Sequence, residues 1–470
     1  MIVASAPAAA ASVPTAKAPA HWDPRILKYV RFVENERGLD FKHPIPVKFL
    51  DDKAFNKQIS TSNSDLTKQD RRDLKTQAGD FYALGLVGPN LDLLKADNQL
   101  GTGDVVGFYD QDKKRMVIRG QDLTATDVRV TVVHELTHAL QDQYFNLTKL
   151  ENHTSTSGEE LALTSLVEGD ASYVEESYLA SLPQAEQDKY YGNNSSTLVN
   201  PAPTTPAAAD VPAALQVLFG VPYDIGYWFV DFLHGKRDDV RHVDAVFRHP
   251  PQSDEQVIDP LAFIKRDVPH PPKLPHLAKG EKRRGAPDEL GAVGLYFTLA
   301  ARLTPRVALD ATTGWNGDRI LRYSTGAKEC VRVAIANDST ADAKQLAAAF
   351  GQWITKGSSD TVDRAGTVVT LDACGSPAAT LPTSDTMQQA ELDLSVRYLD
   401  YAIATNSFHL KMQAARCVGD KMATDTAIVK LITSKSFSDF TAADNALFVM
   451  QLTKFFTACG EQFPGAGSTS

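Results

Sequence analysis

The sequence predicts an α+β fold, in which a large, mainly helical domain with small β elements precedes a small all-α C-terminal domain. The chain has 470 residues, of which 43% are hydrophobic and 23% charged, a globular composition long enough for two or three domains. Helical periodicity and short alternating runs are interspersed up to about residue 375, and beyond about residue 385 the pattern is wholly helical. We therefore expect the large domain at 23–375 and the helical domain at 385–462.

The predicted helices and strands of the large domain follow from their hydrophobic periodicity and from glycine, proline and polar residues at their ends. Asp288 is expected to be the N-cap of one buried helix. In chain order we expect a helix at 23–38, a strand at 45–50, an amphipathic segment at 65–85, a hairpin at 105–110 and 115–120, helices at 127–147 and 157–180, a loop at 193–212, buried helices at 223–235 and 288–303, and strands at 330–337 and 367–374 around a helix at 341–354.

Charge and hydropathy limit the classes of partner. The formal net charge is -10 without a dominant basic stripe, which argues against a protein that binds duplex nucleic acid through its phosphates. The one clear basic cluster, KGEKRRG at 279–285, is expected to be a solvated loop. No apolar run approaches the roughly 18 residues that a membrane-spanning helix requires. We therefore expect a soluble chain that does not bind nucleic acid and does not span a membrane.

The two ends of the chain are expected to lack regular structure. Residues 1–22 are rich in alanine, and they are either the remnant of an export signal or a flexible arm without targeting meaning. Residues 463–470 are expected to be a disordered tail.

The four cysteines form no CxxC pair, so a thiolate zinc site or a thioredoxin-type motif is not expected. We expect disulfides between Cys330 and Cys374 and between Cys417 and Cys459, because each pair then falls within one predicted structural unit. Four buried free thiols are the alternative. The disulfides, if formed, indicate an oxidising compartment.

The segment VVHELTHALQDQ, at 132–143, contains the motif HExxH. On a helix, positions i and i+4 lie on one face, so His134 and His138 can direct their imidazoles at one metal ion. Both histidines lie about 120° to 160° from the centre of an apolar stripe. We therefore expect this helix to have a core face and a separate chemical face. The stripe consists of Val133, Leu136, Leu140, Tyr144 and Leu147.

A zinc hydrolase needs a third protein ligand and leaves the fourth position to water. The HExxHxxGxxH continuation is absent from HELTHALQDQYF, so a nearby third histidine is excluded. If the helices at 127–147 and 157–180 form an antiparallel pair, His138 and Glu168 both lie about 13 Å from the turn between them. Glu168 is therefore the expected third ligand.

Other polar residues near Glu168 fit less well. Glu159 and Glu160 begin the helix, and Glu175 lies about two turns beyond Glu168. Glu175 and Ser172 share a face with Glu168 and could support the ligands, but we expect both to be solvated.

This arrangement predicts one type of chemistry. Zinc held by His134, His138 and Glu168 would lower the pKa of its bound water towards neutrality, and Glu135 would take the proton as general base. Glu135 follows a ligand directly but has a different bearing on the helix, so it can reach the water without coordinating the metal.

These residues resemble the gluzincins, metallopeptidases with HExxH and a distant glutamate ligand. LVEGDASYVEE, at 166–176, is similar to the segment NEGFAEY of gluzincin aminopeptidases, with Glu168 and Gly169 in the matching places. Asp170 departs from that pattern, because the aminopeptidases have an aromatic residue there. The spacing between His138 and Glu168 is also longer than in that family. The resemblance implies a zincin-like catalytic domain.

A closer resemblance is to a group of bacterial, largely exported neutral zinc metallopeptidases. It rests on VVHELTHALQDQYF and LVEGDA, and more loosely on VPYDIGYWFV, PPQSDEQVIDP and GWNGDR. In that group the fourth motif usually ends in His-Pro, whereas Asp259 precedes the proline here. The resemblance implies a secreted, periplasmic or cell-surface peptidase with one Zn²⁺ per chain that hydrolyses proteins or peptides.

A gluzincin also needs a donor that stabilises the oxyanion of the tetrahedral intermediate. Tyr223 and Tyr227 are the candidates, with His242 and His249 behind them, and a packing or surface role is the alternative for each. Asp142 is expected either to orient the imidazole of His138 or to be exposed at the end of the helix.

Other functions are compatible with the same residues. An exported binding or adhesion protein could retain a zincin fold without turnover, although the intact general base Glu135 argues against it. A structural protein with an accidental HExxH would hold no zinc. A zinc site of this kind could also hydrolyse a non-peptide ester or an epoxide.

Overall fold

Two small β-sheets and the helices around them form the structure, a computed structural model that describes residues 18–120, 122–193, 210–235, 241–377, 380–434 and 440–464. The predicted mixture of many helices with small β elements is confirmed. The expected arm at 1–22, loop at 193–212 and tail at 463–470 fall largely outside the described residues. Within the described ranges, no helix is long and apolar enough to cross a membrane.

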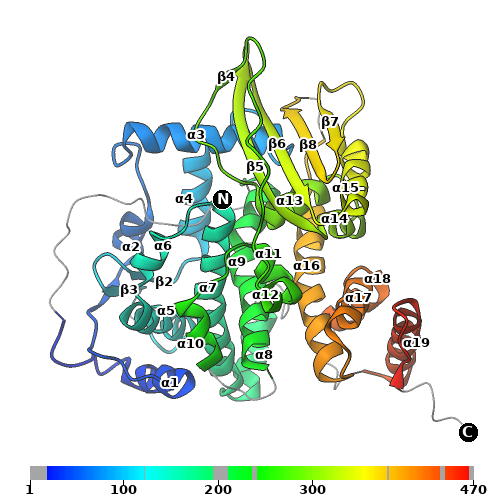
Figure 1. Cartoon of the computed structure of the whole chain (residues 1–470). Coiled ribbons are helices and arrows are strands. Elements are labelled where there is room, and N and C mark those ends of the chain that lie inside the picture. Colours follow the sequence, from blue (N-terminus) through cyan, green and yellow to red (C-terminus); the bar gives the residue numbers. More distant parts are fainter. Residues whose placement is uncertain are drawn as a thin grey trace, which may run out of the picture.

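The N-terminal part is built on a three-stranded sheet with the order β1-β3-β2 (Figure 1). The predicted hairpin is confirmed, because β2 pairs antiparallel with β3, while β1 pairs parallel with β3. Helix α5 packs on this sheet, and α1 packs on α5. The elements of this part are α1 (Leu27–Arg37), β1 (Val47–Leu50), α2 (Asp52–Ile59), α3 (Lys68–Ala83), α4 (Leu93–Asp104), β2 (Gly107–Asp110), β3 (Arg115–Arg119) and α5 (Thr126–Phe145).

Long helices form the centre of the molecule, where α7 packs against both α5 and α9 (Figure 1). The predicted helices at 157–180 and 223–235 are present, and the second begins earlier because Pro222 is accommodated inside it. The elements are α6 (Leu147–Glu151), α7 (Ser157–Ala180), α8 (Gln184–Asn193), α9 (Ala213–His234), α10 (Arg241–Arg248), α11 (Glu255–Ile258) and α12 (Pro260–Lys265).

A five-stranded antiparallel sheet follows, with the order β4-β5-β6-β8-β7. The basic segment at 279–285 was expected to be a loop, but two of its residues form the exposed edge strand β4. Cys330 lies opposite Cys374 on the neighbouring strand, and the predicted disulfide joins them. The elements are β4 (Lys282–Arg283), α13 (Gly291–Ala300), α14 (Pro305–Thr312), β5 (Trp315–Thr325), β6 (Lys328–Asn337), α15 (Thr340–Trp353), β7 (Thr361–Ala365) and β8 (Val368–Cys374).

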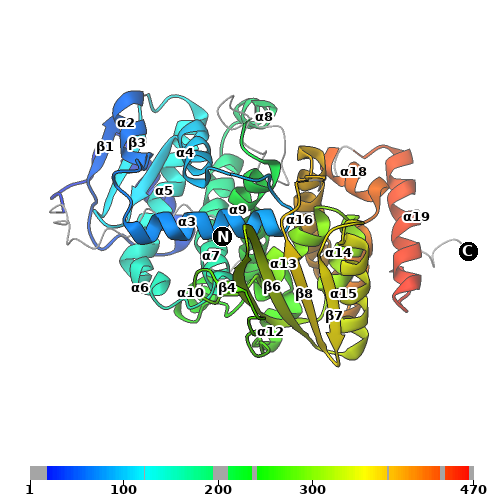
Figure 2. The ribbon, with the colours of Figure 1, turned by 90° about the horizontal axis from the view of Figure 1, so that it is seen from above.

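The described part beyond residue 383 is helical, as predicted, and it extends to one end of the molecule (Figure 2). The second predicted disulfide, Cys417 to Cys459, joins α17 to the end of α19. Arg416 pairs with Asp259 at 2.9 Å, and this ion pair attaches α17 to the start of α12. The helices are α16 (Ser384–Asn406), α17 (Met412–Ala423), α18 (Thr426–Ser434) and α19 (Ala442–Ala458).

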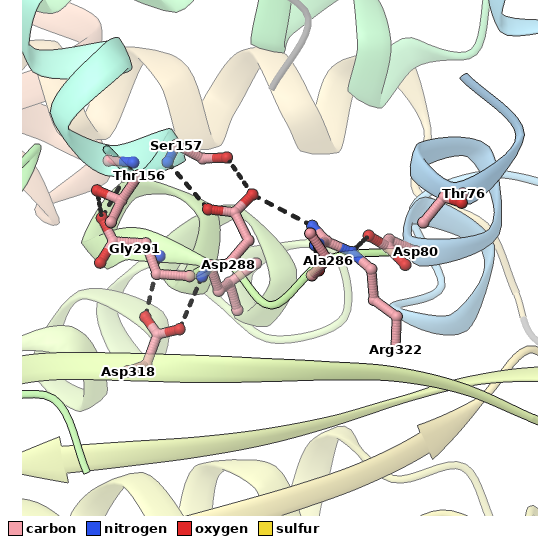
Figure 3. A network of polar contacts seen from close by, with 12 residues as sticks. Thr76, Asp80, Thr156, Ser157, Ala286, Asp288, Gly291, Asp318 and Arg322 are labelled. Atoms are coloured by element: carbon pink, nitrogen blue, oxygen red, sulfur yellow. Dashed lines mark hydrogen bonds and ion pairs between the residues drawn. The ribbon is translucent and has the colours of Figure 1, made fainter. Parts of the chain in front are cut away.

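Buried and half-buried carboxylates join the start of α7 to the five-stranded sheet (Figure 3). The prediction that Asp288 caps α13 is wrong, because its carboxylate accepts hydrogen bonds from the backbone N–H and the hydroxyl of Ser157 on α7. Asp318, on β5, instead accepts from the N–H groups of Leu290 and Gly291 at the start of α13. A contact between distant segments thus replaces the local cap.

Glu289 belongs to the same network, and it accepts hydrogen bonds from Thr156 and from the N–H of Gly158. Burial raises the pKa of its carboxyl to about 7, although the hydrogen bond from Thr156 opposes this shift. The first turn of α7 is therefore attached to a carboxyl group that titrates near neutral pH.

We expect Glu289→Gln to gain stability relative to the wild type as the pH rises from about 5 to about 8. A raised pKa means that the folded state binds the proton more tightly, so the stabilisation is complete at low pH and is lost as the pH rises towards 7. Glutamine keeps an accepting oxygen and does not ionise. Denaturant unfolding should show a relative gain on the order of 1–2 kcal/mol, and a difference independent of pH would contradict this assignment.

Candidate metal centre

The three predicted metal ligands lie together between α5 and α7. His134 Nε2 and His138 Nε2 each lie 3.2 Å from Glu168 Oε2. One possible ligand atom from each residue falls within 4.8 Å of the other two, and among the described residues no other group of three such side chains meets this criterion. These ligand types and this spacing are compatible with a metal ion, without specifying which one.

The antiparallel pairing of α5 and α7 produces this geometry. The earlier histidine, His134, contacts Glu175, while the later one, His138, contacts Glu168. The chain must therefore run in opposite directions in the two helices, as the sequence predicts. The expected chemical face of α5 is present, because His134 and His138 both point at Glu168 on α7, but it is not exposed, since every residue from 132 to 142 is buried. The sheet covers one side of α5 and α7 covers the other.

Gln141, and not the candidate Asp142, fixes the ring of His138. Its side-chain N–H₂ group donates to the carbonyl of Val167 and to Asp170, at 3.0 and 2.9 Å. Both partners are pure acceptors, so the amide oxygen must face His138 Nδ1, which lies 3.0 Å away. Nδ1 therefore carries a proton, which leaves Nε2, the atom that faces Glu168, as the ligand atom of His138. Gln141 lies three residues after His138 on the same helix, and this spacing alone could have suggested the contact.

The contacts of Gln141 continue to the N-terminal helix through a buried charged group. Arg37, on α1, donates to Asp170 at 3.0 Å and to Asp244 at 2.9 Å. Burial alone would lower the pKa of Arg37, but the two carboxylates raise it, so the guanidinium stays charged. Asp170 thus connects Gln141, which holds the ring of His138, to Arg37 on α1, and through Arg37 to Asp244 on α10.

Glu175 fixes the ring of the other histidine, and its expected solvated role is wrong. Its Oε2 lies 2.9 Å from His134 Nδ1, and its Oε1 accepts from the hydroxyl of Tyr190 at 3.3 Å. Burial opposes the charge of His134, but the hydrogen bonds to Glu168 and Glu175 raise its pKa well above the usual value. Burial likewise opposes the charge of Glu168, yet the two histidines hold its pKa far below normal. A metal ion at this cluster would therefore compete with protons.

Glu135 lies beside the cluster but is held by other groups. It is buried, and its Oε2 accepts the backbone N–H of Tyr109, on β2, at 2.7 Å. Burial raises the pKa of Glu135, while the neighbouring histidines lower it. A carboxyl group with a raised pKa binds a proton more tightly than a free one, as a general base requires. Asp142 also contacts β2, because it accepts a hydrogen bond from the hydroxyl of Tyr109.

Tyr223 is the one oxyanion candidate that the structure brings next to the cluster. Its ring is stacked on that of His134, with 6.1 Å between the centroids. Burial, followed by the charges of nearby carboxylates, raises its pKa well above the usual value, so the hydroxyl keeps its proton. Tyr227 instead stacks on Tyr173. The remaining candidates, His242 and His249, are exposed at the surface.

A close contact between two glycines sets the distance between α7 and α9. A Cβ atom on Gly226 would lie 2.1 Å from the carbonyl oxygen of Ser165, and one on Gly169 would lie 2.2 Å from the backbone of Gly226. Only glycine permits this approach of the two backbones. Tyr223 lies one turn before Gly226, and Gly169 follows Glu168, so the contact brings the phenol towards the cluster.

Comparison with known proteins finds one family match, and it covers part of the chain. Residues 281–386 match a family described as a domain of unknown function (DUF8575). No curated protein and no solved structure shows significant similarity to the chain. The matched segment comprises the five-stranded sheet with α13 to α15, and it includes Asp288 and Glu289, which bind the first turn of α7. None of the three candidate ligands lies in it.

We expect Gln141→Leu to weaken zinc binding by about 10- to 100-fold, because His138 loses the group that fixes its ring and its tautomer. Competition with a chromophoric chelator measures this change. Gln143→Leu is the matched control, since Gln143 lies on the same helix but contacts residues 42 and 43 instead. Equal affinities in the two variants would refute the role of Gln141.

We expect Gly226→Ala to destabilise the protein by about 1–3 kcal/mol, because the added methyl group overlaps the carbonyl oxygen of Ser165. Gly351→Ala is the control: its methyl group would meet no atom within 4 Å, and alanine is the better helix former by about 0.5–1 kcal/mol. Urea unfolding of both variants tests the contact. A Gly226→Ala protein as stable as the wild type would show that the helices do not touch there.

Proposed function

We propose that the protein is a zinc-dependent metallopeptidase of the gluzincin class, with His134, His138 and Glu168 as the zinc ligands. The observation that supports this proposal most is the convergence of two imidazole nitrogens and one carboxylate oxygen within 4.8 Å of one another. Two histidines and one glutamate are a known ligand set of catalytic zinc, which keeps its fourth position for water.

The surroundings of the ligands fit a metal ion better than a plain hydrogen-bond network. Each Nδ1 atom is engaged by its own partner, Gln141 or Glu175, so that both Nε2 atoms converge on one oxygen of Glu168. Histidines that ligate metals commonly make such an outer contact through their second nitrogen. The ligands are also nearly buried, with side-chain exposures of 10%, 11% and 17%.

The residues around the ligands supply the remaining steps of a hydrolysis. When bound, zinc supplies a water of lowered pKa and polarises the substrate carbonyl. Glu135 accepts the proton of the attacking water and passes it to the leaving amine, a role for which its raised pKa is suited. Tyr223 keeps its hydroxyl proton and donates a hydrogen bond to the oxyanion.

The proposal also includes the substrate and the cellular compartment of the protein. A protein or peptide is the substrate, and a secreted, periplasmic or cell-surface location agrees with the two disulfides, which persist in oxidising compartments. The resemblance to exported neutral zinc metallopeptidases supports both points. An exported binding protein with the same fold is the alternative, which differs from the proposal by the absence of turnover.

We expect the purified wild type to contain one zinc ion per chain and to cleave an unfolded protein substrate in a chelator-sensitive manner. Glu135→Gln should keep the zinc and lose about 100- to 10,000-fold in rate, because the ligands are intact but the base is missing. Glu168→Ala should lose both zinc and activity. Metal analysis and a fluorescent casein assay measure these effects.

Glu159→Ala is the control for loss of a carboxylate from the same helix, because Glu159 contacts the N–H of Ser155 outside the cluster. It should keep zinc and activity. A wild type that binds zinc but cleaves nothing would favour the binding protein, and a wild type without zinc would contradict the proposal.

A further inference from the structure

Strand β2 presents a backbone donor to Glu135. It is an edge strand in the order β1-β3-β2. The N–H of Arg119 bonds the carbonyl of Val106, which fixes the alternation of the hairpin. Tyr109 and Met116 are then a pair whose backbone groups do not bond each other. The N–H of Tyr109 therefore points to the open edge of the sheet, where Glu135 Oε2 accepts it at 2.7 Å.

The side chain of Tyr109 attaches the same strand to α5 at a second point. Its hydroxyl donates to Asp142 Oδ2 at 2.7 Å. Asp142 lies two turns after Glu135, on the same face of the helix. It is buried, and it also accepts from Lys114 at 2.6 Å and from the N–H of Leu147 at 3.2 Å. Asp142 is thus held in place by several contacts, and the hydroxyl of Tyr109 attaches β2 to it.

We propose that Tyr109 and Asp142 are positioning residues for Glu135. Their contact keeps β2 where the N–H of Tyr109 holds one oxygen of the Glu135 carboxylate, which leaves the other oxygen for the water that attacks the substrate. This inference rests on the proposed function, because Glu135 needs a fixed orientation only if it takes a proton in the reaction. Both residues act through the strand, and a misplaced base slows the proton transfer without changing the ligands.

Tyr109→Phe tests this inference, since it removes the hydroxyl and keeps the ring. We expect the amide at position 109 of the metal-free protein to exchange its hydrogen about tenfold faster, because the strand is no longer held on Asp142. In the zinc-loaded protein we expect kcat to fall about tenfold, with KM and zinc content unchanged. Asp142→Asn, made alone, keeps an acceptor for the hydroxyl of Tyr109, so both values should stay closer to the wild type than in Tyr109→Phe.

Tyr144→Phe is the matched control, because the hydroxyl of Tyr144 also donates at 2.7 Å, to the carbonyl of Asp40, away from Glu135. It should change neither measurement. An unchanged exchange rate in Tyr109→Phe, or an unchanged kcat in an active enzyme, would overturn the positioning role. If the zinc-loaded wild type cleaves nothing, the proposed function fails, and the exchange rate at position 109 alone decides whether Tyr109 holds the strand on Glu135.

Discussion

The carboxylate of Glu168 lies against two imidazoles in the interior of the protein, and the surrounding structure depends on this placement. An ionised carboxylate in such a place costs several kcal/mol unless nearby groups compensate. His134 and His138 provide the compensation, and they hold its pKa far below normal in spite of burial. The register between α5 and α7 must therefore be kept, because a slip by one residue would rotate Glu168 by about 100° away from both rings.

The side chains that hold His138 and the start of α7 connect the register of α5 and α7 to distant parts of the chain. The ring of His138 is held through Gln141 and Asp170 by Arg37, which brings the N-terminal helix into the support of the cluster. The first turn of α7 is held by Asp288 and by its neighbour Glu289, which belong to the segment matched by the family of unknown function. These hydrogen bonds connect the cluster to α1, α10 and the five-stranded sheet.

The helices and the cluster of His134, His138 and Glu168 could be predicted because local geometry determines them. HExxH places two imidazoles on one face of a helix, and equal distances from a turn bring His138 and Glu168 to the same height. The disulfide pairs could also be predicted, because each lies within one structural unit. These predictions needed only helical periodicity and the short distance along the chain between the partners.

The contacts that could not be predicted join segments far apart in the sequence. Hydrophobic periodicity describes single helices and strands and does not show which of them meet. Asp288 looked like a local cap, but it binds Ser157, 131 residues away. Arg37 and Asp170 are separated by 133 residues. Asp142 was wrongly considered for the support of His138, because the hairpin that it binds instead comes from an earlier part of the chain.

An anomalous diffraction map, recorded at the zinc absorption edge from crystals of the zinc-loaded protein, measures the central feature directly. We expect one peak about 2.0–2.2 Å from His134 Nε2, His138 Nε2 and a carboxylate oxygen of Glu168. A crystal that contains zinc but shows its peak on other residues, or no peak between α5 and α7, would contradict the assignment of this cluster as a zinc site.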